Sequence, residues 1–168
     1  MADEKRKICL LGPTGVGKTS LVMRFVRSIF SDAYHTTIGT KIETKQVQCG
    51  ERSVDLVIWD LSGEDEFQRV RLSYLRGSAG YLVVADGTRR HTLETALTLD
   101  SAAADVIGDA PRVLVLNKSD LRVFWEINDN DEKDLVAKGW PLVETSAKTG
   151  AGVEDAFLVL TQALLNGC

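Results

Sequence analysis

The sequence lacks any apolar run close to the roughly 20 residues that a membrane-spanning helix needs. Its start, MADEKRKICLL, also lacks the long apolar region of a signal peptide, so we expect a cytoplasmic protein. A basic excess is absent as well, because 20 Lys and Arg stand against 24 Asp and Glu, for a net charge of −4. This balance argues against nucleic acid and against anionic membranes as main partners.

Cysteine is scarce. The three cysteines, Cys9, Cys49 and Cys168, are far apart and lack the spacing of metal ligands, so we expect reduced thiols that share no site. Internal repeats, low-complexity stretches and linkers are absent too. The 168 residues, 44% of them hydrophobic, are therefore expected to form a single domain that spans residues 1–168.

Short apolar runs alternate with longer helical patterns along the chain. Strands are predicted over 7–11, 40–48, 53–60, 80–86, 112–120 and 140–145, and helices over 20–29, 91–108, 131–139 and 152–165. In the first helix, the residues at helical spacing on one face are Leu21, Val22, Phe25, Val26 and Ile29. Gly50 lies in the turn of a predicted hairpin. The alternation predicts an α/β domain with a mostly parallel sheet, which binds ligands at the carboxyl ends of its strands.

The stretch GPTGVGKT, from Gly12 to Thr19, fits G-x-x-x-x-G-K-[ST] between a predicted strand and a predicted helix. Glycines let successive N–H groups point at a phosphate, and the helix start adds the positive end of its dipole. Lys18 can reach the β- and γ-phosphates, and the Thr19 hydroxyl can bind Mg²⁺. The predicted phosphate-binding residues are Gly15, Val16, Gly17, Lys18, Thr19 and Ser20. This loop does not by itself choose between ATP and GTP.

The stretch NKSD, from Asn117 to Asp120, ends the strand predicted from residue 112. The two carboxylate oxygens of Asp120 suit the N1–H and exocyclic amine of guanine, a paired-donor edge that adenine lacks. Asn117 can tie this loop to the phosphate loop, and the stem of Lys118 can lie along the base. The backbone of ETSAK, residues 144–148, can meet the guanine O6. The sequence therefore predicts a guanine nucleotide, GTP or GDP, as ligand.

Together these motifs resemble those of the Ras-like small GTPases, most closely the Rab branch. The resemblance covers nearly the whole chain and includes GPTGVGKT, YHTTIG, WDLSG, NKSD and ETSAK in this order. It implies the fold of the P-loop NTPases, with a six-stranded, mostly parallel sheet, one antiparallel edge strand and five helices. It also implies a monomeric GTP-hydrolysing switch. Effectors, exchange factors and activating proteins would bind it through residues 31–40 and 62–76.

The same resemblance assigns roles to further residues. It implies that Phe30 packs edge-on against the guanine and that Thr37 binds Mg²⁺ and the γ-phosphate. Asp60 would hold Mg²⁺ through water, and the N–H of Gly63 would touch the γ-phosphate. The residues that complete the base pocket would be Ser146, Ala147 and Lys148.

Several of these residues also allow a plainer interpretation. Phe30 can be a core aromatic, and Tyr34 can cover the phosphates or be exposed. Trp59 fits a sheet residue, but an aromatic beside a switch segment can also anchor a partner. His35 and His91 are expected at the surface rather than in catalysis.

Three departures from the family pattern matter for activity and membrane binding. Glu64 stands where the family has the Gln that orients the attacking water, and Thr14 replaces a glycine of the phosphate loop. The residues expected to take part in hydrolysis are Lys18, Thr37, Gly63 and Glu64, and we expect hydrolysis to be slow. The chain stops at LLNGC without a C-a-a-X box or a polybasic stretch, so we expect no autonomous membrane binding.

Two other functions remain open from the sequence alone. One is a GTP-binding scaffold or regulatory module with little or no hydrolysis, which Glu64 and Thr14 would favour. The other is a P-loop kinase of nucleotides or metabolites. A kinase would leave NKSD unexplained.

Overall fold

The structure is a computed structural model that describes residues 4–31, 41–61 and 72–168. In these residues six strands form one sheet, in the order β2-β3-β1-β4-β5-β6. The strands are β1 (Glu4–Leu11), β2 (Lys41–Cys49), β3 (Arg52–Asp60), β4 (Gly80–Asp86), β5 (Arg112–Asn117) and β6 (Leu142–Glu144). The edge strand β2 runs antiparallel to β3, and the other neighbouring pairs are parallel. The predicted fold class is confirmed.

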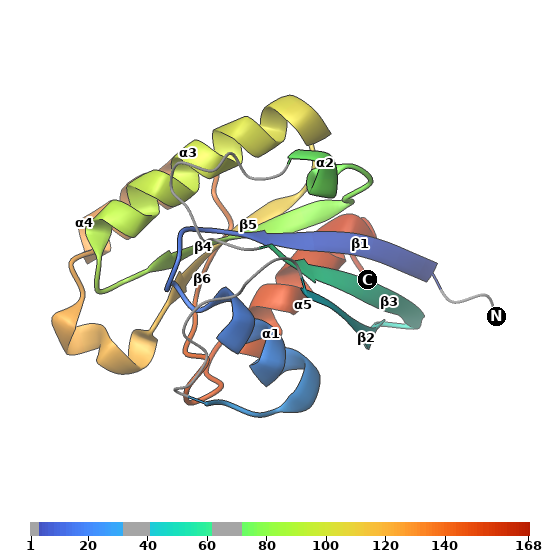
Figure 1. The fold of residues 1–168 in the computed structure, drawn as a ribbon, viewed down its shortest axis with the longest axis horizontal. Coiled ribbons are helices and arrows are strands. Elements are labelled where there is room, and N and C mark those ends of the chain that lie inside the picture. Colours follow the sequence, from blue (N-terminus) through green and yellow to red (C-terminus); the bar gives the residue numbers. More distant parts are fainter. Residues whose placement is uncertain (1–3, 32–40, 62–71) are drawn as a thin grey trace.

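Helices cover both faces of the sheet (Figure 1). They are α1 (Lys18–Arg27), α2 (Leu72–Leu75), α3 (Arg90–Ile107), α4 (Asp129–Ala137) and α5 (Val153–Leu164), with a 3-10 helix η1 (Ser119–Phe124). One apolar core lies between the sheet and the helix pair α1 and α5. In this core the rings of Phe25 and Phe157 are stacked with their centroids 3.9 Å apart. A second core lies under α2, α3 and α4. None of the helices in the described ranges has the length and apolar character that crossing a membrane requires.

The strand sequences follow this two-sided burial. All seven residues of β4 are buried, as expected for a central strand with helices on both faces. Strand β3 alternates between buried and partly exposed positions, because it lies between β1 and the exposed edge strand β2. Gly50 has a φ of 63° in the β2–β3 turn, the conformation that glycine adopts without strain. The predicted hairpin is therefore present.

Helix α1 is shorter than its apolar pattern suggests. It ends at Arg27, since Ser28 takes a left-handed conformation with a φ of 56°. Ile29 lies beyond the helix and is 47% exposed, so its expected place on the buried face was wrong. Leu21, Val22 and Phe25 do lie buried on that face.

The prediction for the cysteines was wrong for two of the three. Cys49, at the end of β2, and Cys168 form a disulfide with their Cα atoms 5.4 Å apart, although 119 residues separate them in sequence. The fold brings them together because the end of α5 lies against the β2–β3 hairpin, where Arg52 donates to the carbonyl oxygen of Leu165. Cys9 is a buried free thiol, as expected.

Candidate functional site

Most of the predicted site residues that the structure describes lie at the carboxyl ends of the parallel strands. The phosphate loop follows β1, Asp60 ends β3, Asn117 ends β5, and residues 145–148 follow β6. These strand ends share one edge of the sheet, where β1, α1 and the loops of β5 and β6 meet (Figure 1). Segments more than 100 residues apart in the sequence thus build a single site, as expected for an open parallel sheet.

The phosphate loop leads directly into α1. Gly17 precedes the helix with a φ of 101°, and within the described residues no side chain caps the helix start. The first N–H groups of α1 therefore have no side-chain acceptor there and can serve an anion. A Cβ at Gly17 would lie 2.3 Å from Nδ2 of Asn117, so this close approach requires glycine.

Lys18 lies in the curve of the phosphate loop and is buried. Its ammonium donates to the carbonyl oxygens of Gly12 and Pro13, at 2.8 and 3.3 Å. Burial lowers the pKa of Lys18 to about 8, and the charge of Asp60 opposes this shift. Among the described residues, the acceptors of this buried ammonium are two uncharged carbonyl oxygens, so it is well placed to bind the negative charge of a phosphate.

Thr19 and Asp60 form the part of the site that fits a divalent cation. The Thr19 hydroxyl donates to Oδ2 of Asp60 at 2.6 Å. The other carboxylate oxygen, Oδ1, is buried and has no hydrogen-bond partner among the described residues. Burial raises the pKa of Asp60, while the Thr19 hydrogen bond and the charge of Lys18 oppose the shift. A hydroxyl oxygen beside an unpaired carboxylate oxygen is the hard donor set that Mg²⁺ prefers.

Asn117 joins the phosphate loop to the loop after β6. It is 2% exposed, and its Nδ2 donates to the carbonyl oxygen of Val16 at 2.9 Å. Its Oδ1 accepts from the Thr145 hydroxyl at 3.0 Å and from the backbone N–H of Ala147 at 3.3 Å. The predicted tie between the NKSD stretch and the phosphate loop is therefore present, and the contacts with the loop after β6 add to it.

Asp120 is held in place by Ser146. The Ser146 hydroxyl donates to Oδ1 of Asp120 at 2.7 Å and accepts from the backbone N–H of Thr149 at 3.1 Å. Because each carboxylate oxygen can accept two hydrogen bonds, this contact leaves both oxygens of Asp120 able to accept from a ligand. Ser146 and Ala147 are buried and Lys148 is exposed, so the backbone of this loop, rather than the Lys148 side chain, is fixed by packing.

Lys118 is anchored by a residue that the sequence motifs did not indicate. Its ammonium lies 2.8 Å from Oδ2 of Asp86, the fully buried last residue of β4. Burial alone would raise the pKa of Asp86, but the Lys118 ammonium and the hydrogen bonds of Thr88 hold it below its usual value. The sequence signal that could have indicated Asp86 as a site residue is its position at the carboxyl end of an apolar strand.

Two further side chains support the base loops and were also missed. Arg24 of α1 donates to the backbone carbonyl oxygens of Ala147, at 2.8 Å, and of Lys148. The indole N–H of Trp125 donates to the carbonyl oxygen of Lys118 at 2.9 Å. Neither residue belongs to a recognisable motif: Arg24 contacts a segment more than 100 residues away, and Trp125 contacts a carbonyl seven residues before it.

Of the remaining predicted residues, Phe30, Trp59 and His91 lie within the described ranges. Phe30 is partly buried and packs against the core under α1 and α5, which agrees with the interpretation as a core aromatic. Trp59 is a β3 residue, and His91 is exposed. The expected contacts of Tyr34, His35, Thr37, Gly63 and Glu64 lie outside the described residues.

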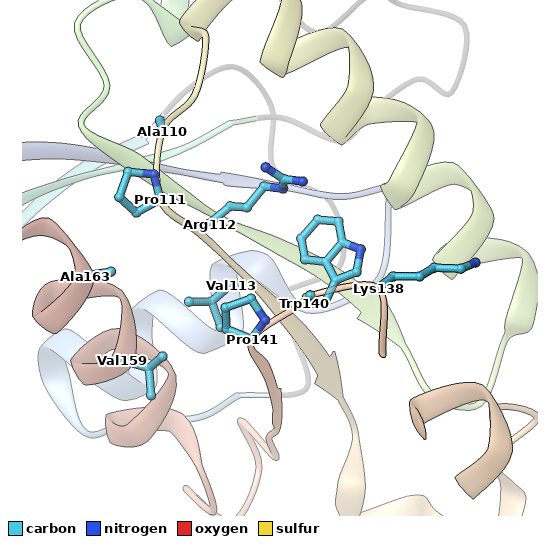
Figure 2. A pocket seen from close by; sticks show the side chains of 10 residues that line it. Ala110, Pro111, Arg112, Val113, Lys138, Trp140, Pro141, Val159 and Ala163 are labelled. Carbon is cyan, nitrogen blue, oxygen red and sulfur yellow. The ribbon is translucent and has the colours of Figure 1, made fainter. Parts of the chain in front are cut away.

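A hollow of about 250 Å³ lies away from these residues, at the amino ends of β5 and β6. Figure 2 shows Pro111, Trp140 and Pro141 lining it, with the guanidinium of Arg112 beside the Trp140 ring, 4.6 Å from its centroid. None of the predicted site residues in the described ranges lines this hollow. It is therefore separate from the candidate site.

Comparison with known proteins shows the family to which the chain belongs. The model of the Ras family matches residues 7–166. Ras-related protein Rab-31 of Homo sapiens and that of Rattus norvegicus are each 36% identical over 162 residues, which cover 94% of this chain and 82% of the relative. Ras-related protein Rab-22A of Mus musculus is 35% identical over 169 residues, covering 98% of this chain and 86% of the relative. The chain therefore belongs to the Ras family of small GTPases, within its Rab branch.

Proposed function

We propose that this small GTPase binds GTP and GDP through the loops described above and holds Mg²⁺ between Thr19 and Asp60. The position of Asn117 carries the proposal, because one side chain joins the loop that suits phosphates to the loop that suits guanine. Lys18 would neutralise the β- and γ-phosphates from inside the loop. Asp120, oriented by Ser146, would accept both donors of the guanine edge.

The binding assignment can be tested by a change of base preference. Replacing Asp120 by Asn presents an amide N–H where guanine has its exocyclic amine. Xanthine carries a carbonyl there, so Asp120→Asn is expected to prefer xanthosine diphosphate over GDP. Titration of fluorescent forms of both nucleotides measures the preference. An Asp120→Asn protein that still prefers GDP would contradict the role given to Asp120.

Mg²⁺ would supply positive charge beside the β- and γ-phosphates when it is bound. The Thr19 hydroxyl and Oδ1 of Asp60 would be the protein groups on its side, with Thr37 as the third residue proposed from the family pattern. Thr19→Asn is expected to weaken Mg²⁺-dependent GDP binding without unfolding the sheet. The check is the dissociation rate of GDP with Mg²⁺ and with a chelator. If the chelator speeds release equally in wild type and Thr19→Asn, the assignment of Thr19 fails.

We further propose that intrinsic hydrolysis is slow because Glu64 replaces the water-orienting Gln. An ionised Glu64 cannot donate a hydrogen bond and brings a negative charge towards the γ-phosphate. At about 5 Å and an effective dielectric near 20, such a pair costs about 3 kcal/mol. If between half and all of this cost remains in the barrier, the rate falls by roughly ten- to a hundredfold. Single-turnover hydrolysis should therefore be faster for Glu64→Gln, and a slower variant at neutral pH would identify Glu64 as a working general base.

The partners proposed for this switch are effectors, exchange factors and activating proteins that bind residues 31–40 and 62–76. The described residues next to these segments support a binding surface. Ile42 is 52% exposed and lies opposite Trp59 in the β2–β3 register, and the Trp59 ring is 5.9 Å from that of Tyr74. Pull-down with the GTP- and GDP-loaded protein, with Ile42→Asp as the variant, tests this surface. Binding that ignores both the nucleotide and the variant would contradict it.

A monomeric, cytoplasmic protein without affinity for nucleic acid or for bare membranes also remains our proposal. Light scattering on purified protein, cell fractionation and sedimentation with anionic vesicles test these points. Strong vesicle binding at physiological salt would overturn the membrane part.

A further inference from the structure

Arg89 occupies a position that local helix chemistry disfavours. It is the residue just before α3, with an extended backbone, where Ser, Thr, Asp or Asn would cap the helix. Its positive charge also lies at the positive end of the helix dipole. The backbone N–H of the next residue, Arg90, instead finds an acceptor in the carboxylate of Glu126. A residue that violates two local rules is expected to have a tertiary role.

The tertiary contacts of Arg89 lead to the phosphate loop. Its Nε donates to Oδ2 of Asp86 at 3.0 Å, and a terminal nitrogen donates to the carbonyl oxygen of Thr14 at 3.4 Å. The same nitrogen would lie 3.2 Å from a Cβ at Gly15, so the guanidinium packs on the bare backbone of the loop. Gly15 has a φ of 82°, which itself favours glycine. Arg89 thus supports two consecutive residues of the phosphate loop from outside.

The charges around Arg89 leave a positive excess beside the loop. Asp86 is fully buried and is the common partner of two cations, Arg89 at 3.0 Å and Lys118 at 2.8 Å. One carboxylate neutralises one of these charges, so this group of three keeps a net charge of +1. It lies between the phosphate loop and the base loop, where a polyphosphate would bring negative charge.

We propose that Arg89 is a positioning residue that braces the phosphate loop and adds positive charge beside it, so that bound nucleotide is retained longer. The inference rests on the proposed nucleotide site. Arg89 acts through Thr14, Gly15 and Asp86. Its effect should therefore grow with the number of phosphates that the loop surrounds.

Four proteins test the proposal: wild type, Arg89→Ala, Arg89→Lys and the control Arg90→Ala. Arg90 is the next residue and is similarly exposed, 44% against 38%, but it pairs with Asp131. The measurements are the release rate of a fluorescent GDP and the equilibrium competition of GDP and GMP for the site. Arg89→Ala is expected to release GDP about tenfold faster, equivalent to about 1.4 kcal/mol. The GDP release rate of Arg89→Lys should lie between those of wild type and Arg89→Ala, because lysine keeps the charge but cannot contact Asp86 and Thr14 at the same time.

The comparison of the two nucleotides separates bracing from general damage. If Arg89 supports the phosphate loop, Arg89→Ala should weaken GDP binding about tenfold and GMP binding by less than about twofold. The reason is that GMP lacks the β-phosphate that the loop encloses. Equal losses for GDP and GMP, an unchanged GDP release rate, or an equal effect of Arg90→Ala would each overturn the inference. A wild-type protein that binds no GDP would overturn the proposed function as well. If wild type binds GDP and Arg89→Ala binds and releases GDP as wild type does, this inference alone is overturned and the proposed function stands.

Discussion

Replacing Asn117 by alanine removes the side chain that joins the phosphate loop to the loop after β6. Three hydrogen bonds are lost: one to the carbonyl oxygen of Val16, one from the Thr145 hydroxyl and one from the backbone N–H of Ala147. Thr145 and Ala147 are themselves 0% and 3% exposed, so water cannot readily replace the missing acceptor. Asn117→Ala would therefore leave the Thr145 hydroxyl and the Ala147 N–H buried without this hydrogen-bond acceptor.

The size of the effect follows from these three bonds. Each contributes about 1 kcal/mol net, so Asn117→Ala is expected to lower the free energy of unfolding by about 3 kcal/mol. For a chain of this length, that corresponds to a fall in Tm of about 6–12 °C. If about half of the loss also weakens the nucleotide-bound state, GDP release becomes roughly tenfold faster.

The assay combines thermal unfolding with the release rate of a fluorescent GDP, and Asn128→Ala is the matched control. Asn128 caps α4 by accepting from the backbone N–H of Asp131, which is a role within that helix start. Its loss should cost about 1 kcal/mol of stability and leave GDP release unchanged. If Asn117→Ala also lowers Tm without speeding GDP release beyond about twofold, the coupling of the two loops through Asn117 is refuted.

Three further predictions follow from single contacts. Gly17→Ala should abolish GDP binding, because its Cβ would displace the Asn117 amide, and wild-type affinity would contradict this close approach. Burial and the nearby Glu144 raise the pKa of Glu132 to about 7, above its unfolded value near 4.5. The protonated Glu132 therefore adds to the free energy of unfolding below about pH 4.5, and this contribution is lost as the pH rises through about 7. Glu132→Gln should raise Tm more at pH 8 than at pH 5, and equal shifts would refute this. Reduction of the disulfide should lower the Tm of wild type but not of Cys49→Ser, since a closed loop of 119 residues gains up to about 5 kcal/mol; equal sensitivity to the reductant in both proteins would refute this.

The sequence by itself determined the fold class and the centre of the site. Glycine spacing, the Lys18–Thr19 pair and the NKSD stretch are local patterns, and each follows a strand whose apolar run is visible without a structure. Parallel strands carry their ligands at their carboxyl ends, so the approach of Asp60 and Asn117 to the phosphate loop could be expected. The antiparallel edge strand and the implied order of elements came from the family resemblance.

Only the tertiary structure decided which distant side chains support these loops. Asp86 meets Lys118 because β4 pairs with β5, and Arg89 meets Thr14 because β4 also neighbours β1. The pairing of Cys49 with Cys168 depends on where α5 ends against the β2–β3 hairpin. Such contacts depend on strand order and helix placement, which no window of neighbouring residues contains. Local patterns therefore identify the residues that face the ligand, while packing decides what holds those residues in place.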